Sequence, residues 1–111
     1  MEVPVLQGER AETVLESRLE YVEGAPVRVR LRKRGRRFDL RDDGRAVELA
    51  GRPPGWRELA VRLVERELSL NVSRDGVVFV LAVAGGLDLG RLAERVADAS
   101  LALYQELLDV R

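Results

Sequence analysis

Arginine side chains recur at alternate positions in the middle of this sequence, and they are the groups best suited to bind a ligand. They alternate with valine and leucine over residues 27–32, and four more follow by residue 41. A guanidinium group matches the forked geometry of phosphate and carboxylate. A row of arginines on one surface could therefore hold phosphate or an acidic partner. The candidate partner-binding arginines are Arg28, Arg30, Arg32, Arg37 and Arg41.

The same arginines have a structural alternative, which is a solvated sheet face held by ion pairs between strands. Asp39 lies within the row, and we expect it opposite Arg30, where such a pair contributes from a few tenths to about 1 kcal/mol. A nucleic-acid or phosphate-ligand binder is a further alternative for this face. It has less support, because no aromatic residue lies between the arginines to stack a base and the whole chain is neutral.

The composition argues against enzymatic chemistry. The chain has no histidine and no cysteine, so it lacks thiolates, disulfides and the side chain that titrates near neutral pH. Metal sites would need oxygen ligands alone, and no spaced carboxylate loop of that kind occurs. Asp42 and Asp43 are adjacent carboxylates, but they lie in an expected turn. We therefore expect no enzyme activity, no catalytic residues, no metal and no cofactor.

The chain also lacks the features of exported and membrane proteins. Its first residues have neither the basic start nor the apolar run of a signal peptide. No apolar stretch reaches the roughly 20 residues of a membrane helix. We expect one cytoplasmic domain over residues 1–111 that has no membrane partner. A single lysine among many arginines is typical of a thermophilic or GC-rich source.

The strongest structural signal is the strict alternation over residues 27–32, which predicts a half-buried strand. Two turn dipeptides follow, Arg34-Gly35 and Asp43-Gly44. If each forms a two-residue hairpin turn, residues 27–50 fold into a three-stranded meander with apolar residues on one face. The arginines would then share the other face, which is the surface on which the binding hypothesis depends.

Three helices and a second hairpin are predicted around this meander. Apolar spacing predicts helices over residues 9–23 and 56–67. Asp75-Gly76 marks a hairpin over residues 68–83 that pairs Val72 with Phe79. Asp88 is a suitable N-cap for a last helix that ends near residue 109. Gly85-Gly86, just before it, fits neither the dinucleotide fingerprint nor the P-loop spacing.

The second strand of that hairpin is apolar on both faces, so one of its rows needs a cover. With Phe79 in the core, the other row consists of Val78, Val80 and Ala82. A homodimer would bury that row, and two-fold dimers are the commonest arrangement. The alternative is that the first or last helix packs there within one chain.

Trp56 is the other candidate binding residue. It follows Pro53-Pro54-Gly55 and begins the helix predicted over residues 56–67. It could anchor that helix in the core, or it could lie exposed at a groove that receives a partner.

The predicted order is α-β-β-β-α-β-β-α, an α+β class with a five-stranded, mostly antiparallel sheet and helices on one face. This order, and a closing amphipathic helix that begins Leu89-Gly90-Arg91-Leu92-Ala93, resembles the class I type III secretion chaperones and the related YbjN-like proteins. The resemblance implies a non-enzymatic homodimer that binds extended segments of a protein or peptide partner. Secretion chaperones are usually acidic, so the neutral charge favours the YbjN-like branch and a chaperone- or adaptor-like role.

Overall fold

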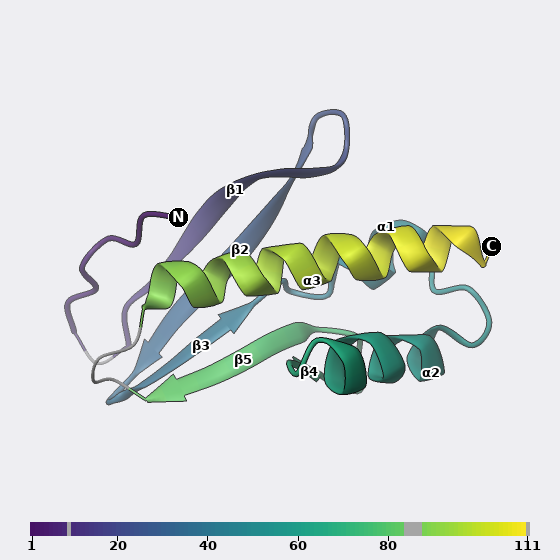
Figure 1. Ribbon diagram of the computed structural model, residues 1–111. Coiled ribbons are helices and arrows are strands. Elements are labelled where there is room, and N and C mark those ends of the chain that lie inside the picture. Colours follow the sequence, from purple (N-terminus) through teal and green to yellow (C-terminus); the bar gives the residue numbers. More distant parts are fainter. Residues whose placement is uncertain (9, 84–87, 111) are drawn as a thin grey trace.

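The computed structural model describes residues 1–8, 10–83 and 88–110, and Gly85-Gly86 lie outside this range. Its five strands form one antiparallel sheet in the order β1-β2-β3-β5-β4, which confirms the α+β class (Figure 1). The helix α2 (Trp56–Ala60) continues into the wider turns of η1 (Val61–Glu67). The elements are β1 Glu12–Val22, β2 Ala25–Arg34, β3 Arg37–Arg41, α1 Arg45–Ala50, α2 Trp56–Ala60, η1 Val61–Glu67, β4 Asn71–Val72, β5 Val78–Val83 and α3 Leu89–Asp109.

The first predicted helix is wrong, because most of residues 9–23 form the long edge strand β1. Burial alternates strictly along it: Leu15 and Tyr21 are buried, and Glu12, Glu16 and Glu20 are exposed. Apolar residues at helical spacing hid this period of two. The glutamates that share a helix face at every fourth position share a strand face as well, so they could not separate the two structures.

The third strand of the predicted meander is also wrong, because residues 45–50 form the short helix α1. Asp43 and Gly44 do have the positive φ angles of a tight turn, 59° and 75°. The turn leads into a helix, and the place beside β3 is taken by β5. Ala, Glu and Leu favour helix over strand, and Ala46, Val47 and Ala50 are buried on one side of it.

The β2–β3 hairpin forms with its loop one residue later than predicted. Its two loop residues are Gly35 and Arg36, and Leu31 pairs with Leu40 instead of Phe38. A displaced loop of unchanged length moves the pairing by two residues, and side chains alternate with a period of two. The apolar face and the arginine face therefore stay as predicted, while every cross-strand partner changes.

The β4–β5 hairpin departs further from its prediction, because its loop has three residues and not two. Ser73 pairs with Val77, and Gly76 closes the loop with φ of 90°. A turn followed by a left-handed glycine is the usual three-residue hairpin loop. The pairing is consequently displaced by one residue, so that Val72 lies opposite Val78. A one-residue displacement reverses the two faces of β5.

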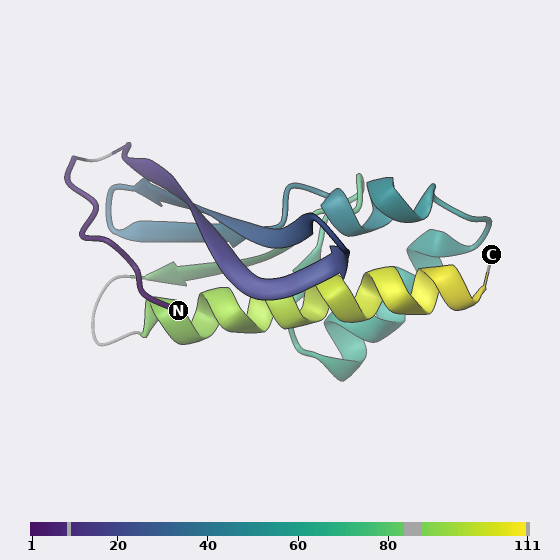
Figure 2. The same cartoon turned by 90° about the horizontal axis from the view of Figure 1, so that it is seen from above.

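Helix α3 covers one face of the sheet, and it begins as predicted. The Asp88 side chain accepts a hydrogen bond from the Arg91 amide at 3.1 Å, as an N-cap does. Figure 2 shows α3 lying along one side of the sheet, with the β1–β2 hairpin curving toward it. None of the described helices combines the length and apolar character that crossing a bilayer would require.

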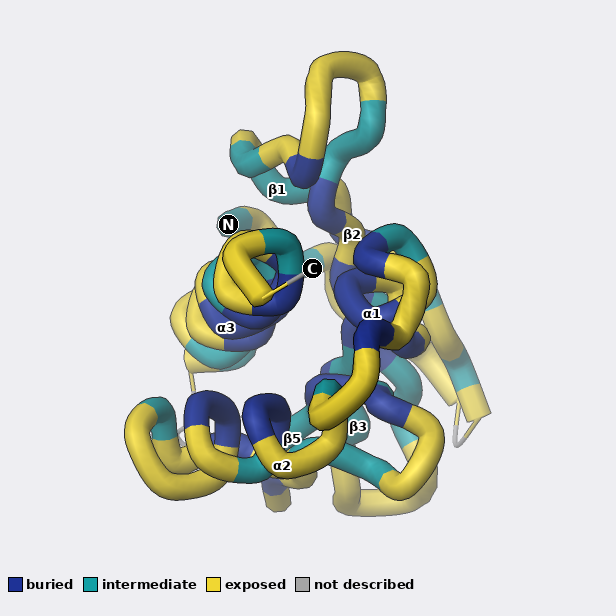
Figure 3. Tube along the Cα trace, turned by 90° about the vertical axis from the view of Figure 1, so that its right-hand side faces the viewer, coloured by how far each residue is buried: buried dark blue, intermediate teal, exposed yellow. Residues whose placement is uncertain are grey.

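The core lies between α3 and the sheet, and it is closed at one end by α1 and α2. Figure 3 shows the buried positions of these helices turned toward a shared interior. Fully buried residues of this core are Val27, Val29, Leu31, Leu40, Val47, Val64, Val78, Val96, Leu103 and Leu107. The opposite face of the sheet, which α3 does not cover, is called the outer face.

The observed order is β-β-β-α-α-β-β-α, with α2 and η1 counted as one helix. It differs from the predicted order at residues 12–22 and 45–50. The resemblance to secretion chaperones and YbjN-like proteins was argued from the predicted order, which is not the observed one, and it stays a prediction.

Candidate functional site

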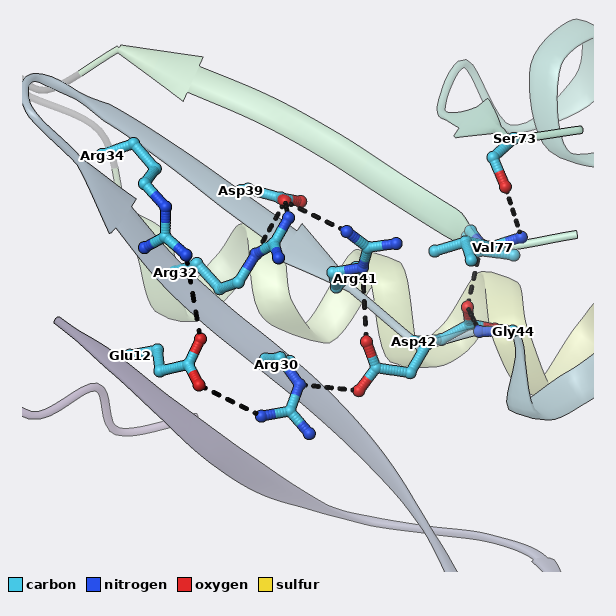
Figure 4. Close-up of polar contacts among 12 residues, drawn as sticks. Glu12, Arg30, Arg32, Arg34, Asp39, Arg41, Asp42, Gly44, Ser73 and Val77 are labelled. Atoms are coloured by element: carbon cyan, nitrogen blue, oxygen red, sulfur yellow. Dashed lines mark hydrogen bonds and ion pairs between the residues drawn. The ribbon is translucent and has the colours of Figure 1, made fainter. Parts of the chain in front are cut away.

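The outer face is built from residues of β1, β2, β3 and β5 that point away from α3. Its charged part is an ion-pair network across the first three strands (Figure 4). Asp39 accepts hydrogen bonds from Arg32 at 2.5 Å and from Arg41 at 3.5 Å. Arg30 bonds Asp43 at 2.8 Å and lies 3.7 Å from Glu12. The carboxylates thus alternate with the guanidinium groups.

This network changes the meaning of the predicted arginine row. Among the five candidate arginines, Arg28, Arg30, Arg32 and Arg41 each have a carboxylate within 4.0 Å. The hydrogen bond from Arg30 to Asp43 raises the pKa of that guanidinium above its ordinary value. Arg37 is exposed, and it is the one of the five with no ion pair to the described residues. The row is therefore a mostly neutralised surface, which matches the structural alternative.

An apolar row lies beside the network on the same face. Because the faces of β5 are reversed, its outward residues are Phe79, Leu81 and Val83. Leu81 is 59% exposed and Val83 is 60% exposed. Each lies opposite a charged residue of β3: Phe79 opposite Arg41, Leu81 opposite Asp39, and Val83 opposite Arg37. A row of apolar side chains bordered by charges is a common feature of protein contact surfaces.

The dimer interface predicted from sequence must be corrected for the same reason. Val78 is fully buried, Ala82 is 8% exposed, and Val80 packs against the core. They lie under α3 within one chain, so they are not a free surface. Neither the composition nor the dipeptide Asp75-Gly76 reveals the true loop length. The signal that could have found it was Ser73, whose hydroxyl accepts from the Val77 amide at 3.0 Å and closes a longer loop.

The backbone of β5 is open on one side over its second half. Val78 exchanges bonds with Asp42 on the β3 side, through its own carbonyl at 2.9 Å and its amide at 2.8 Å. Backbone groups alternate in direction along a strand, so those of Leu81 and Val83 point away from β3. Strand β4 pairs only with Val78 and Phe79. Among the described residues, no strand pairs with the backbone groups of Leu81 and Val83 on that side (Figure 1).

A buried hydrogen-bonded cluster holds β5 in this position. The Asp42 carboxylate accepts from the amides of Gly44 and Val78, each at 2.8 Å, and from the Ser100 hydroxyl at 2.6 Å. The Tyr21 hydroxyl lies 2.6 Å from Ser100 Oγ. The cluster therefore joins β1, β3, β5 and α3. Burial raises the pKa of the Asp42 carboxyl, and it raises the pKa of Tyr21 to about 12.

This cluster can do little chemistry of its own, because Asp42, Ser100 and Tyr21 are all buried. Its amide and hydroxyl donors serve to satisfy the carboxylate and to fix the register of β5. Among the residues that the structure describes, no three carboxylates come together as a metal-binding group.

Comparison with protein-family models, curated proteins and solved structures finds no match. What the outer face does must therefore be argued from its own residues.

Trp56 lies away from the outer face. It is half-buried, packs against the core and has the Arg57 guanidinium carbon 6.0 Å from its ring centre. It contacts the β4–β5 loop, where a Cβ added to Gly76 would lie 3.0 Å from Trp56 Cζ3. This position matches the structural alternative, in which the tryptophan anchors its helix.

A hollow of about 890 Å³ between β1 and α3 is the other candidate site. Two of its acidic side chains already have cationic partners: Glu16 lies 3.5 Å from Arg28, and Glu94 lies 2.5 Å from the Met1 amino group. These two carboxylates are therefore already neutralised within the chain, which weakens the hollow as a ligand site. The outer face and the open side of β5 remain the better candidate.

Proposed function

We propose that the protein is a cytoplasmic, non-enzymatic protein-binding module with a chaperone- or adaptor-like role. The apolar row of β5 on its outer face receives an extended segment of a partner protein. The observation that carries the proposal is the apolar row of Phe79, Leu81 and Val83 on a sheet face that α3 leaves uncovered. Single exposed apolar residues are ordinary, but here two exposed residues, Leu81 and Val83, continue the row of the half-buried Phe79 as one apolar patch.

The chemistry of the face indicates what such a partner segment would contain. Apolar side chains at alternate positions would lie along the row, since a strand presents every second residue to one face. Arg37 is exposed at one end of the row and would favour an acidic residue there. Phe79, the aromatic member of the row, is the expected anchor, because aromatic residues dominate binding energies at protein contacts.

Selection from a displayed library of random peptides tests this function. We expect selected peptides to alternate apolar and polar residues, and Phe79→Thr to weaken their binding at least tenfold, which corresponds to about 1.4 kcal/mol. Threonine keeps the strand preference of the position. Val14→Thr on the outer face of β1 is the matched control and should leave binding unchanged. No selected peptides, or equal binding by both variants, would overturn the proposal.

A salt titration of the purified protein against generic DNA and RNA tests the nucleic-acid alternative. Binding to generic DNA or RNA through the arginines would weaken steeply as salt is raised. Because four of the five candidate arginines already have carboxylate partners, we expect no binding even at low salt. Salt-sensitive binding that Arg37→Gln reduces would favour the alternative over the peptide-binding function.

A further inference from the structure

We infer that the open side of β5 pairs with β5 of a second copy of this chain, antiparallel, with Leu81 of each copy opposite Val83 of the other. This gives the expected homodimer an interface different from the one predicted by sequence. The inference goes beyond the proposed function, because it concerns the backbone edge of β5 and not the side chains that a partner would contact.

The first reason is a contrast between the two long edges of the sheet. The amide of Lys33 donates to the Ala11 carbonyl at 2.8 Å, so Ala11 faces β2 and the backbone groups of Glu12, Val14 and Glu16 face outward. That edge carries two glutamates, and its pairing is irregular after Glu16. Charges and bulges are the devices by which proteins prevent edge-to-edge association.

The open side of β5 has none of these devices. Its outward backbone groups belong to Leu81 and Val83, whose side chains are apolar and exposed. The pairing of β5 with β3 is regular over Phe79–Val83. An open, apolar edge is a template for another strand, and β-strand addition is an established mode of recognition.

Two-fold symmetry and the described extent of β5 together select the register. Centring the two-fold axis on Leu81 would bring Val83 against Phe79 of the second copy, a residue that β4 already occupies. Centring it on Ala82 places Leu81 of each copy opposite Val83 of the other. Both pairs lie within the part of β5 that β4 leaves open. The two pairs exchange both of their backbone bonds, which gives four hydrogen bonds between copies.

The side chains suit this register. On the outer face, Leu81 meets Val83 of the second copy, and such apolar cross-strand pairs are favourable. On the inner face the two Ala82 residues meet, and their small size allows close approach. No charged residue of β5 comes opposite a like charge, because none of Val80–Val83 is charged. A second copy is therefore complementary to this edge in the size and charge of the paired side chains.

Pairing would join the two sheets into one of ten strands with the two apolar rows side by side. The outward side chains of Leu81 and Val83 stay on the outer face and remain available to a partner. The dimer would thus double the apolar surface of the proposed binding face, which a single copy presents only along one strand.

Sedimentation equilibrium of the full chain tests the pairing, from roughly 10 µM to roughly 1 mM, since a contact smaller than a standard interface associates weakly. We expect a concentration-dependent dimer for the wild type and for Val14→Lys, and a monomer for Leu81→Lys. Both substituted positions are exposed on the outer face, so the second variant is matched to the first. A wild type that stays monomeric, or a Leu81→Lys variant that stays dimeric, would overturn the inference.

A single cysteine reports the register and does not depend on the charged variant. The chain has no cysteine of its own, so Ala82→Cys can form a disulfide only between copies. In the predicted register the two Ala82 residues form a non-hydrogen-bonded pair, whose Cα atoms are about 4.5 Å apart. A disulfide can span this distance. Under mild oxidation we expect Ala82→Cys to cross-link at least tenfold faster than Val14→Cys. Equal rates would contradict the pairing, whatever the outcome of the peptide selection.

Discussion

Replacing Asp42 with alanine is expected to lower the free energy of unfolding by about 3–6 kcal/mol, because it leaves several buried donors without a partner. The carboxylate is 3% exposed and accepts from the Gly44 amide, the Val78 amide and the Ser100 hydroxyl. Each buried donor that loses its acceptor costs about 1–3 kcal/mol. Urea unfolding followed by circular dichroism measures the change.

The neighbouring carboxylate provides the control. The Asp43 side chain is 45% exposed and pairs with Arg30 and Arg41 at the surface. Exposed pairs contribute about 0–1 kcal/mol, so Asp43→Asn should lie within that range. The asparagine keeps the preference of this position for a positive φ. If the two positions proved equally sensitive, the buried cluster would not be the support of β5 that the hydrogen bonds indicate.

The Asp42 carboxyl also makes stability depend on pH. Its pKa is raised by burial above the unfolded value near 3.8, so the folded chain binds this proton more tightly than the unfolded chain. The contribution is therefore fully present below that value and is lost as the pH rises through the folded pKa. Relative to Asp42→Asn, which has no such proton, the wild type should lose stability over that window. A difference independent of pH would contradict the shift.

Gly76→Ala is expected to lower the free energy of unfolding by about 2–5 kcal/mol. The residue has φ of 90°, and a Cβ there would lie 2.5 Å from Val47 Cγ2 and 3.0 Å from Trp56 Cζ3. The left-handed backbone costs an alanine about 1–2 kcal/mol, and crowding the core adds about 1–3 kcal/mol. Thermal unfolding monitored by the fluorescence of Trp56, which lies beside Gly76, measures the loss of stability.

Gly35→Ala separates these two costs. Gly35 also has a positive φ, 61°, but nothing lies within 4 Å of its Cβ position. It should cost only the conformational part, about 1–2 kcal/mol. If Gly35→Ala were as damaging as Gly76→Ala, the close packing of the β4–β5 loop on Val47 and Trp56 would be without energetic consequence.

Sequence patterning predicted the elements whose partners lie close along the chain. The alternation of Val27, Val29 and Leu31 against arginines could only be a strand, and the N-cap at Asp88 begins a long helix as predicted. The β2–β3 loop moved by one residue, but its length was correct, so the faces were preserved. Local chemistry is sufficient where one turn determines the geometry.

The errors arose where a distant partner decides the structure. Residues 45–50 have apolar positions that suit a strand, but β5 occupies the place beside β3 because Asp42 bonds Val78, 36 residues away. In the β4–β5 hairpin, the loop was one residue longer than the dipeptide Asp75-Gly76 implies. That single residue reverses the faces of β5. The inner row is therefore Val78, Val80 and Ala82, and the outer row, which forms the candidate site, is Phe79, Leu81 and Val83.

Amide hydrogen exchange of Leu81 and Val83, followed by NMR as a function of protein concentration, distinguishes an open β5 edge from a paired one. The backbone amides of these residues point to the open side of β5, so in dilute protein they should exchange rapidly. Protection of Leu81 and Val83 should increase with protein concentration. The amides of Val14 and Glu16, on the outward edge of β1, should stay unprotected at every concentration. Amides of Leu81 and Val83 that are protected even at high dilution, or unprotected at every concentration, would contradict the account.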